Sequence, residues 1–175
     1  MEKGYIQIYT GEGKGKTTAA LGLAFRAAGR GFHVTFVQFL KGMYTGEEES
    51  IKRFENIRLY RLAEAKKLFW NLTELEQEDL KKQTQKEWAE FVEYIKKQNC
   101  DVLILDEIMG ALKNELLSEE QVCDFLDNKP ESLEIILTGR NVPAAIKERG
   151  DLITEMNKIR HYYDSGVTSR EGIEK

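Results

Sequence analysis

The sequence is poor in the residues that build metal centres and disulfide frameworks. It holds two cysteines, two histidines and two prolines in 175 residues, and the cysteines do not form a Cys-x-x-Cys pair. Two cysteines are too few for a disulfide framework, and their number is typical of a protein from a reducing compartment. Structural zinc sites draw on four closely spaced cysteine or histidine ligands, so we do not expect one here.

A long apolar run and an excess of positive charge are also absent. No stretch approaches the ~20 apolar residues that a membrane-spanning helix needs, and the first residues lack the apolar region of a secretory signal. Lysine and arginine number 26 against 30 aspartates and glutamates, which gives a formal net charge of −4. A chain of this charge has no overall electrostatic reason to bind nucleic acid. We therefore expect a soluble, cytoplasmic protein whose partners include neither a membrane nor a nucleic acid.

Apolar residues make up 41% of the chain, in short runs that alternate with longer helical patterns. Runs rich in β-branched and apolar residues predict strands at 5–9, 33–40, 57–62, 102–105 and 133–137. Helical patterns occupy 16–30 and 73–98, and shorter helices are predicted after Ser118 and at Pro143. This alternation, without linker or repeat, predicts one domain over residues 1–175 with a mostly parallel sheet and helices on both faces.

Capping boxes mark the start of two of these helices. Thr73 with Glu76, and Ser118 with Gln121, have the spacing of this motif. The first side chain accepts a hydrogen bond from the backbone of the third helical residue, whose own side chain reaches back to the cap. We expect both pairs to form.

The strongest chemical signal lies between the first predicted strand and the first predicted helix, where residues Thr10 to Thr18 read TGEGKGKTT. Phosphate-binding loops end in Gly-Lys-Ser/Thr, which Gly15, Lys16 and Thr17 supply, although Thr10 replaces the first glycine of the pattern. The glycines let backbone amides converge on a phosphate, the lysine adds a cation, and the threonine hydroxyl suits Mg²⁺. The residues predicted to bind the nucleotide are Gly11, Glu12, Gly13, Lys14, Gly15, Lys16, Thr17 and Thr18.

Two acidic residues close the apolar strand at 102–105. Asp106 and Glu107 stand where phosphate-loop proteins place the carboxylate of their Mg²⁺ site. Ligands of parallel sheets bind outside the carboxyl ends of the strands, so this pair should face the phosphate loop. We predict Thr17 and Glu107 as the Mg²⁺ ligands, and Lys16 and Glu107 as catalytic residues.

The pattern does not by itself name a reaction. Arg140, after the strand at 133–137, is predicted to reach a phosphate or a ribose of the nucleotide. The other arginines are scattered, without the cluster typical of the lid of a nucleotide kinase. Glu107 could align a water molecule, as an ATPase requires. The residues therefore leave a kinase, an ATPase and a switch protein open.

Five segments together resemble the corrinoid adenosyltransferases of the cobalamin-salvage type. They are TGEGKGKTTAALGLAFRAAGRG, FVQFLKG, VLILDE, ILTGR, and HYYDSGV followed by GI, and the resemblance runs from about Gly4 to Ile173. It implies a RecA-like phosphate-loop fold, a homodimer, and transfer of the 5′-deoxyadenosyl group of ATP to Co(I) of a corrinoid with release of triphosphate. It also implies Mg²⁺, and ATP held in the reverse sense from kinases, so that the 5′ carbon is exposed.

The resemblance assigns a further role to Phe69 and Trp70. Aromatic residues in this segment of the family displace the lower axial ligand of Co(II), which makes reduction to Co(I) accessible, with a flavodoxin-like protein as the implied reductant. The family separates its two aromatics by one residue, whereas Phe69 and Trp70 are adjacent. Both could instead pack in the core or a loop. Two other functions stay open: a small phosphate-loop ATPase or kinase, and a nucleotide-dependent binding module without turnover.

Overall fold

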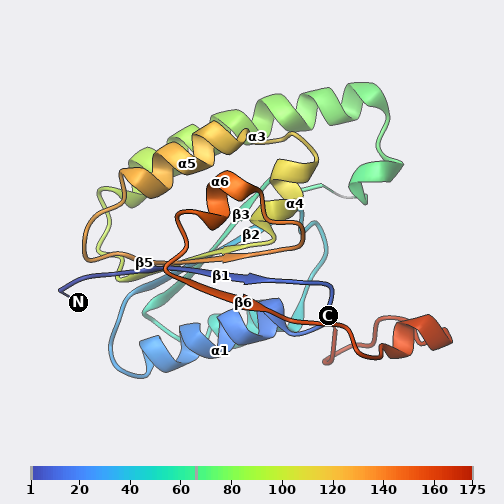
Figure 1. Ribbon diagram of the computed structural model, residues 1–175, viewed down its shortest axis with the longest axis horizontal. Helices are drawn as coiled ribbons and strands as arrows, with labels where there is room; N and C mark the ends of the chain where they lie inside the picture. The colour runs from blue at the N-terminus through green and yellow to red at the C-terminus, as the bar shows by residue number, and fades with distance from the viewer. Residues whose placement is uncertain (1, 66, 175) are drawn as a thin grey trace.

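One six-stranded sheet, in which every strand pairing is parallel, forms the centre of the protein (Figure 1). The computed structural model describes residues 2–65 and 67–174. The strands are β1 (Ile6–Thr10), β2 (Val34–Phe39), β3 (Ile57–Leu62), β4 (Val102–Asp106), β5 (Glu134–Thr138) and β6 (Leu152–Glu155). They lie in the order β3-β2-β4-β5-β1-β6. The predicted α/β class with a parallel sheet is confirmed.

Helices cover both faces of this sheet (Figure 1). The first face carries α1 (Lys16–Ala28) and α2 (Gly46–Ile51), and the second carries α3 (Glu74–Ile95), α4 (Ile108–Lys113), α5 (Glu119–Asp127) and α6 (Ala144–Lys147). Two short 3₁₀ helices complete the chain, η1 (Phe69–Asn71) and η2 (Tyr162–Ser165). Both predicted capping boxes form, at the start of α3 and of α5.

Side-chain size explains why α1 lies close to the sheet. Ala20, Ala24 and Ala27 recur on its buried face, where small residues allow a close approach to the strands. On the opposite face, Trp88 of α3 fills the larger gap, with its ring centroid 6.2 Å from that of Phe39 and 5.3 Å from that of Phe125. Because α1 is held tightly, the loop that precedes it is held tightly as well.

All six carboxyl ends of the strands meet at one edge of the sheet, since the strands are parallel. The phosphate loop leaves β1 at this edge, and the residues after β4 and β5 lie beside it. In the described residues, no helix is long and apolar enough to cross a membrane.

The edge strand β6 supports the phosphate loop from outside. Beyond its end, the Met156 N–H donates to the Thr10 carbonyl (2.8 Å), and the Met156 carbonyl accepts from the Gly13 N–H (2.6 Å). A Cβ on Gly13 would lie 2.6 Å from that same carbonyl oxygen, and Gly11 also has a left-handed φ of 97°. The glycines of the loop are thus required by its packing on Met156 as well as by a ligand.

We therefore expect Gly13→Ala to lower stability, because the added methyl would meet backbone atoms of Met156 and Asn157 that belong to no flexible side chain. Gly22→Ala is the matched control: nothing lies within 4 Å of its Cβ position inside α1, so it should stabilise by about 0.5–1 kcal/mol. Urea unfolding of both variants measures the contrast. Equal stability of the two would show that the loop does not depend on Met156.

Candidate active site

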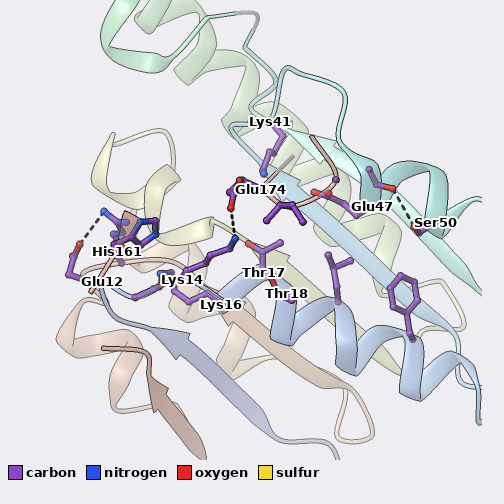
Figure 2. Close-up of a pocket in the computed structure, with 18 residues that line it drawn as sticks. Glu12, Lys14, Lys16, Thr17, Thr18, Lys41, Glu47, Ser50, His161 and Glu174 are labelled. Atoms are coloured by element: carbon purple, nitrogen blue, oxygen red, sulfur yellow. Dashed lines mark hydrogen bonds and ion pairs between the residues drawn. The ribbon is translucent and has the colours of Figure 1, made fainter. Parts of the chain in front are cut away.

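A cavity of about 620 Å³ opens over the phosphate loop at the carboxyl edge of the sheet (Figure 2). Its residues come from the loop, α1, the segment after β2, the start of α2, the β5–α6 connection and the C-terminal segment. They are Glu12, Gly13, Lys14, Gly15, Lys16, Thr17, Thr18, Leu21, Phe25, Lys41, Gly46, Glu47, Ser50, Arg140, His161, Gly172, Ile173 and Glu174. The structure thus brings the predicted loop residues Glu12 to Thr18 together with Arg140.

The N-terminus of α1 is open to an anion. Gly15 precedes it with a φ of 117°, no described side chain caps its first turn, and that turn contains no acidic residue. Free N–H groups and the positive end of the helix dipole favour a phosphate at such a position. Lys16 donates to the carbonyls of Gly11 (2.7 Å) and Gly13 (2.8 Å), so its ammonium lies within the loop. Burial is the main cause that lowers the pKa of Lys16, and the positive charge of Arg140 lowers it further.

Asp106, the last residue of β4, joins the loop to the neighbouring strands. Its side chain is fully buried, and one carboxylate oxygen accepts from the hydroxyls of Thr17 (2.8 Å) and Thr138 (2.7 Å). The other oxygen has no hydrogen-bond partner among the described residues. Burial raises the pKa of Asp106, an effect that the two hydroxyl hydrogen bonds oppose. Since the Thr17 hydroxyl donates its hydrogen bond to Asp106, the lone pairs of the Thr17 oxygen are left for a ligand.

Glu107 follows in a left-handed conformation, with φ 61° and ψ 26°. Non-glycine residues adopt this conformation infrequently, and its backbone is secured here because the Glu107 N–H donates to the Thr138 hydroxyl (2.9 Å). Burial raises the pKa of the Glu107 carboxyl, as does the charge of Asp106, while Lys16 and Lys41 act in the opposite direction. Unlike Asp106, Glu107 is only partly buried, and it is not among the residues that line the cavity.

The sequence signals and the site differ in two respects. We predicted Glu107 as the Mg²⁺ ligand beside Thr17, whereas the carboxyl group that contacts Thr17 belongs to Asp106. Asp106 is the last residue of β4, whereas Glu107 lies beyond the strand in a left-handed conformation that no local pattern in the sequence predicts. The cavity also includes Lys41, two residues beyond the end of β2, which the sequence signals did not indicate. Glu47 at the start of α2 lines it as well, and its carboxylate accepts from Gln38 (2.9 Å).

Phe69 and Trp70 lie in η1, and neither lines the cavity. Figure 1 shows η1 beyond the carboxyl ends of the strands, on the side that carries α3. Phe69 is partly buried and packs against the core, whereas Trp70 is 72% exposed. The structure therefore separates the two aromatics that the sequence pairs: one contributes to packing, and the other faces outward.

The chain matches one protein family over residues 2–174, the family described as ATP:corrinoid adenosyltransferase BtuR/CobO/CobP. It belongs to this family. Three relatives named corrinoid adenosyltransferase match 99% of the chain: a Sinorhizobium protein at 38% identity, and proteins of Pseudomonas aeruginosa and Escherichia coli K12 at 31%. The matches cover 81%, 84% and 86% of those proteins respectively. The resemblance noted in the sequence is confirmed.

The similar solved structures inform the fold alone, since their sequence identity to this chain is low. EccC (ATPases 2 and 3) from Thermomonospora curvata superposes with a TM-score of 0.52 at 11% identity, over 87% of this adenosyltransferase-family chain. The cytoplasmic domain of EssC gives 0.52 at 18% identity, over 95%. The family member spans about a third of these longer chains, 31% and 35%. The predicted RecA-like phosphate-loop fold is confirmed.

The hydrogen bonds around Asp106 lead to a test. In Thr138→Val, the Glu107 N–H loses its acceptor and Asp106 loses a donor, so we expect a loss of about 1–3 kcal/mol of unfolding free energy. Thr35→Val is the control, because Thr35 is buried in the same sheet but accepts only a weak bond from the Cys100 thiol. Denaturant unfolding compares the two variants. A loss in Thr138→Val no larger than in the control would contradict the role given to Thr138.

Proposed function

We propose that this protein transfers the 5′-deoxyadenosyl group of ATP to Co(I) of a corrinoid, with release of triphosphate. The observation that carries the proposal is a phosphate loop, open to a cavity of about 620 Å³, in a chain that belongs to the corrinoid adenosyltransferase family. An ATPase or a kinase is not favoured, because the relatives that match the whole chain are named adenosyltransferases.

The reaction does not require an acid or a base from the protein. The electron pair of Co(I) forms the bond to the 5′ carbon, and the bond from that carbon to the triphosphate oxygen breaks with its electrons going to the leaving group. No proton has to be removed, so the protein must align the reactants and stabilise the negative charge on the triphosphate. Lys16, Lys14 and the open N-terminus of α1 are placed for this second task.

The residues present fit a magnesium ion. Mg²⁺ usually takes one or two carboxylates together with phosphate oxygens and water. Thr17, whose hydroxyl donates to Asp106, and Glu107, which is only partly buried, would hold it. The second carboxyl oxygen of Asp106, which has no hydrogen-bond partner among the described residues, belongs to the residue next to Glu107. When bound, the ion would neutralise part of the charge on the triphosphate. Asp106 acts through Thr17 and is thus a positioning residue.

We also infer the remaining features from the family resemblance. Phe69 and Trp70 are assigned to the corrinoid side of the reaction, where they would displace the lower axial ligand of Co(II). A homodimer, a cytoplasmic location and a flavodoxin-like reductant complete the proposal. The exposure of Trp70 supports its part, because an exposed indole is free to pack on an apolar face of a substrate.

The first test removes the loop cation. Lys16→Ala should lower the rate of adenosylated corrinoid formation by about 100-fold, the range for loss of one preorganised electrostatic contact, without a change in fold. Lys86→Ala is the control, because Lys86 is exposed on α3 away from the cavity. The rate is followed by the corrinoid absorbance with ATP, Mg²⁺ and chemically reduced corrinoid. Near-normal turnover by Lys16→Ala would refute the assignment of the phosphate loop.

The second test separates reduction from transfer. Trp70→Ala should cripple the reaction started from Co(II) with a mild reductant, yet retain most of its rate when a strong chemical reductant supplies Co(I). Its melting temperature should not change, since the side chain is exposed, whereas Phe69→Ala should also lower stability because Phe69 packs on the core. Tyr5→Ala removes an exposed aromatic before β1 and serves as control. Equal losses from Co(II) and from Co(I) in Trp70→Ala would exclude the axial-ligand role.

A further inference from the structure

A C-terminal strap, residues 158–174, lies across the phosphate loop and closes one side of the cavity. After β6 the chain forms η2 beyond the carboxyl edge and then turns back toward the loop (Figure 1). His161, Gly172, Ile173 and Glu174 of the strap line the cavity. One wall of the candidate active site is therefore formed by a segment that is far from the loop in sequence: Glu174 and Lys14 are 160 residues apart.

Glu174 is the residue by which the strap holds the loop. Its carboxylate accepts from the ammonium of Lys14 (2.6 Å), from the Tyr162 hydroxyl, and from the backbone N–H (2.8 Å) and guanidinium (3.0 Å) of Arg170. Arg170 and then Lys14 hold the pKa of Glu174 well below its usual range. The side chain is only 16% exposed. Glu174 is thus a fixed anion at the entrance of an anion-binding loop.

Lys14 is the group for which this anion and a nucleotide would compete. Figure 2 shows the Lys14 and Glu174 side chains directed toward each other across the cavity above Thr17. Lys14 also donates to the Tyr162 hydroxyl (2.7 Å), and its ammonium lies 5.4 Å from the centre of the Tyr162 ring. A triphosphate on the loop would bring further negative charge to the same ammonium. The carboxylate of Glu174 and a triphosphate bound to the same ammonium would repel each other. The two anions therefore favour different positions of the strap.

We propose that Glu174 is a latch, an anion of the chain itself that occupies Lys14 until a triphosphate displaces it. Nucleotide binding then releases the strap, and the return of Glu174 to Lys14 favours departure of the triphosphate product. The inference rests on the proposed function, whose leaving group is triphosphate. A ligand that must first displace the latch binds with an affinity reduced by the fraction of molecules in which the latch is open.

The test uses inorganic triphosphate and ATP, each with Mg²⁺, as calorimetric ligands of the full chain. Glu174→Gln keeps the size of the side chain and removes its charge, so it should bind triphosphate about 5-fold more tightly, as expected for loss of one partly exposed competing ion pair. Asp164→Asn is the matched control. It removes one negative charge from the same strap, where Asp164 pairs with Lys158 (2.9 Å) and does not line the cavity, and should leave the affinity unchanged.

Hydrogen exchange provides a second readout. Triphosphate should speed the exchange of strap amides in the wild type, whereas in Glu174→Gln these amides should already exchange fast without ligand. The latch is refuted if Glu174→Gln binds triphosphate equally or more weakly, or if triphosphate slows the exchange of the wild-type strap. If the wild type makes adenosylated corrinoid but Glu174→Gln binds triphosphate no more tightly than the wild type, the latch alone is refuted. A wild type that binds neither ATP nor triphosphate refutes the latch and the proposed function together.

Discussion

The buried carboxylate of Asp106 is the contact on which the geometry of the site depends. It lies at the end of β4, and through Thr138 on β5 and Thr17 on α1 it ties together two strand ends and the helix that follows the phosphate loop. A charge removed from water is unfavourable unless hydrogen bonds compensate it, so the two hydroxyls are needed at fixed positions. The same hydroxyl of Thr138 secures the left-handed backbone of Glu107. One buried carboxyl group thereby orients both proposed ligands of Mg²⁺.

The positive groups of the phosphate loop are arranged around bonds within the chain. Lys16 donates to two loop carbonyls, and Lys14 is bound to Glu174. The loop itself is supported by Met156 beyond β6 and by the alanine face of α1. Since the backbone is held from outside, ligand binding need only exchange the partners of two ammonium groups. Preorganisation of this kind reduces the rearrangement that binding and charge stabilisation require.

Much of this structure could be predicted from local signals in the sequence. Five strands, both capping boxes and the phosphate loop depend on residues close together in the chain, and periodicity or spacing identifies them. The edge strand β6 has no such signal, because its four residues are all exposed and burial imposes no pattern on them. Asp106 and Glu107 are adjacent, so their different roles depend on which side of the strand end each faces. The pairing of Lys14 with Glu174 joins residues from the two ends of the chain, and no local pattern encodes it.

The proposed function requires that the cavity present the 5′ carbon of ATP, and not its γ-phosphate, to the acceptor. Phosphorus NMR of a reaction with ATP, Mg²⁺ and chemically reduced corrinoid tests this most directly, with the adenosylated corrinoid quantified in the same sample. We expect one inorganic triphosphate for each cobalt–carbon bond formed, and no ADP when the corrinoid is omitted. Steady release of ADP and phosphate without corrinoid would contradict it, because the loop would then present the γ-phosphate to water.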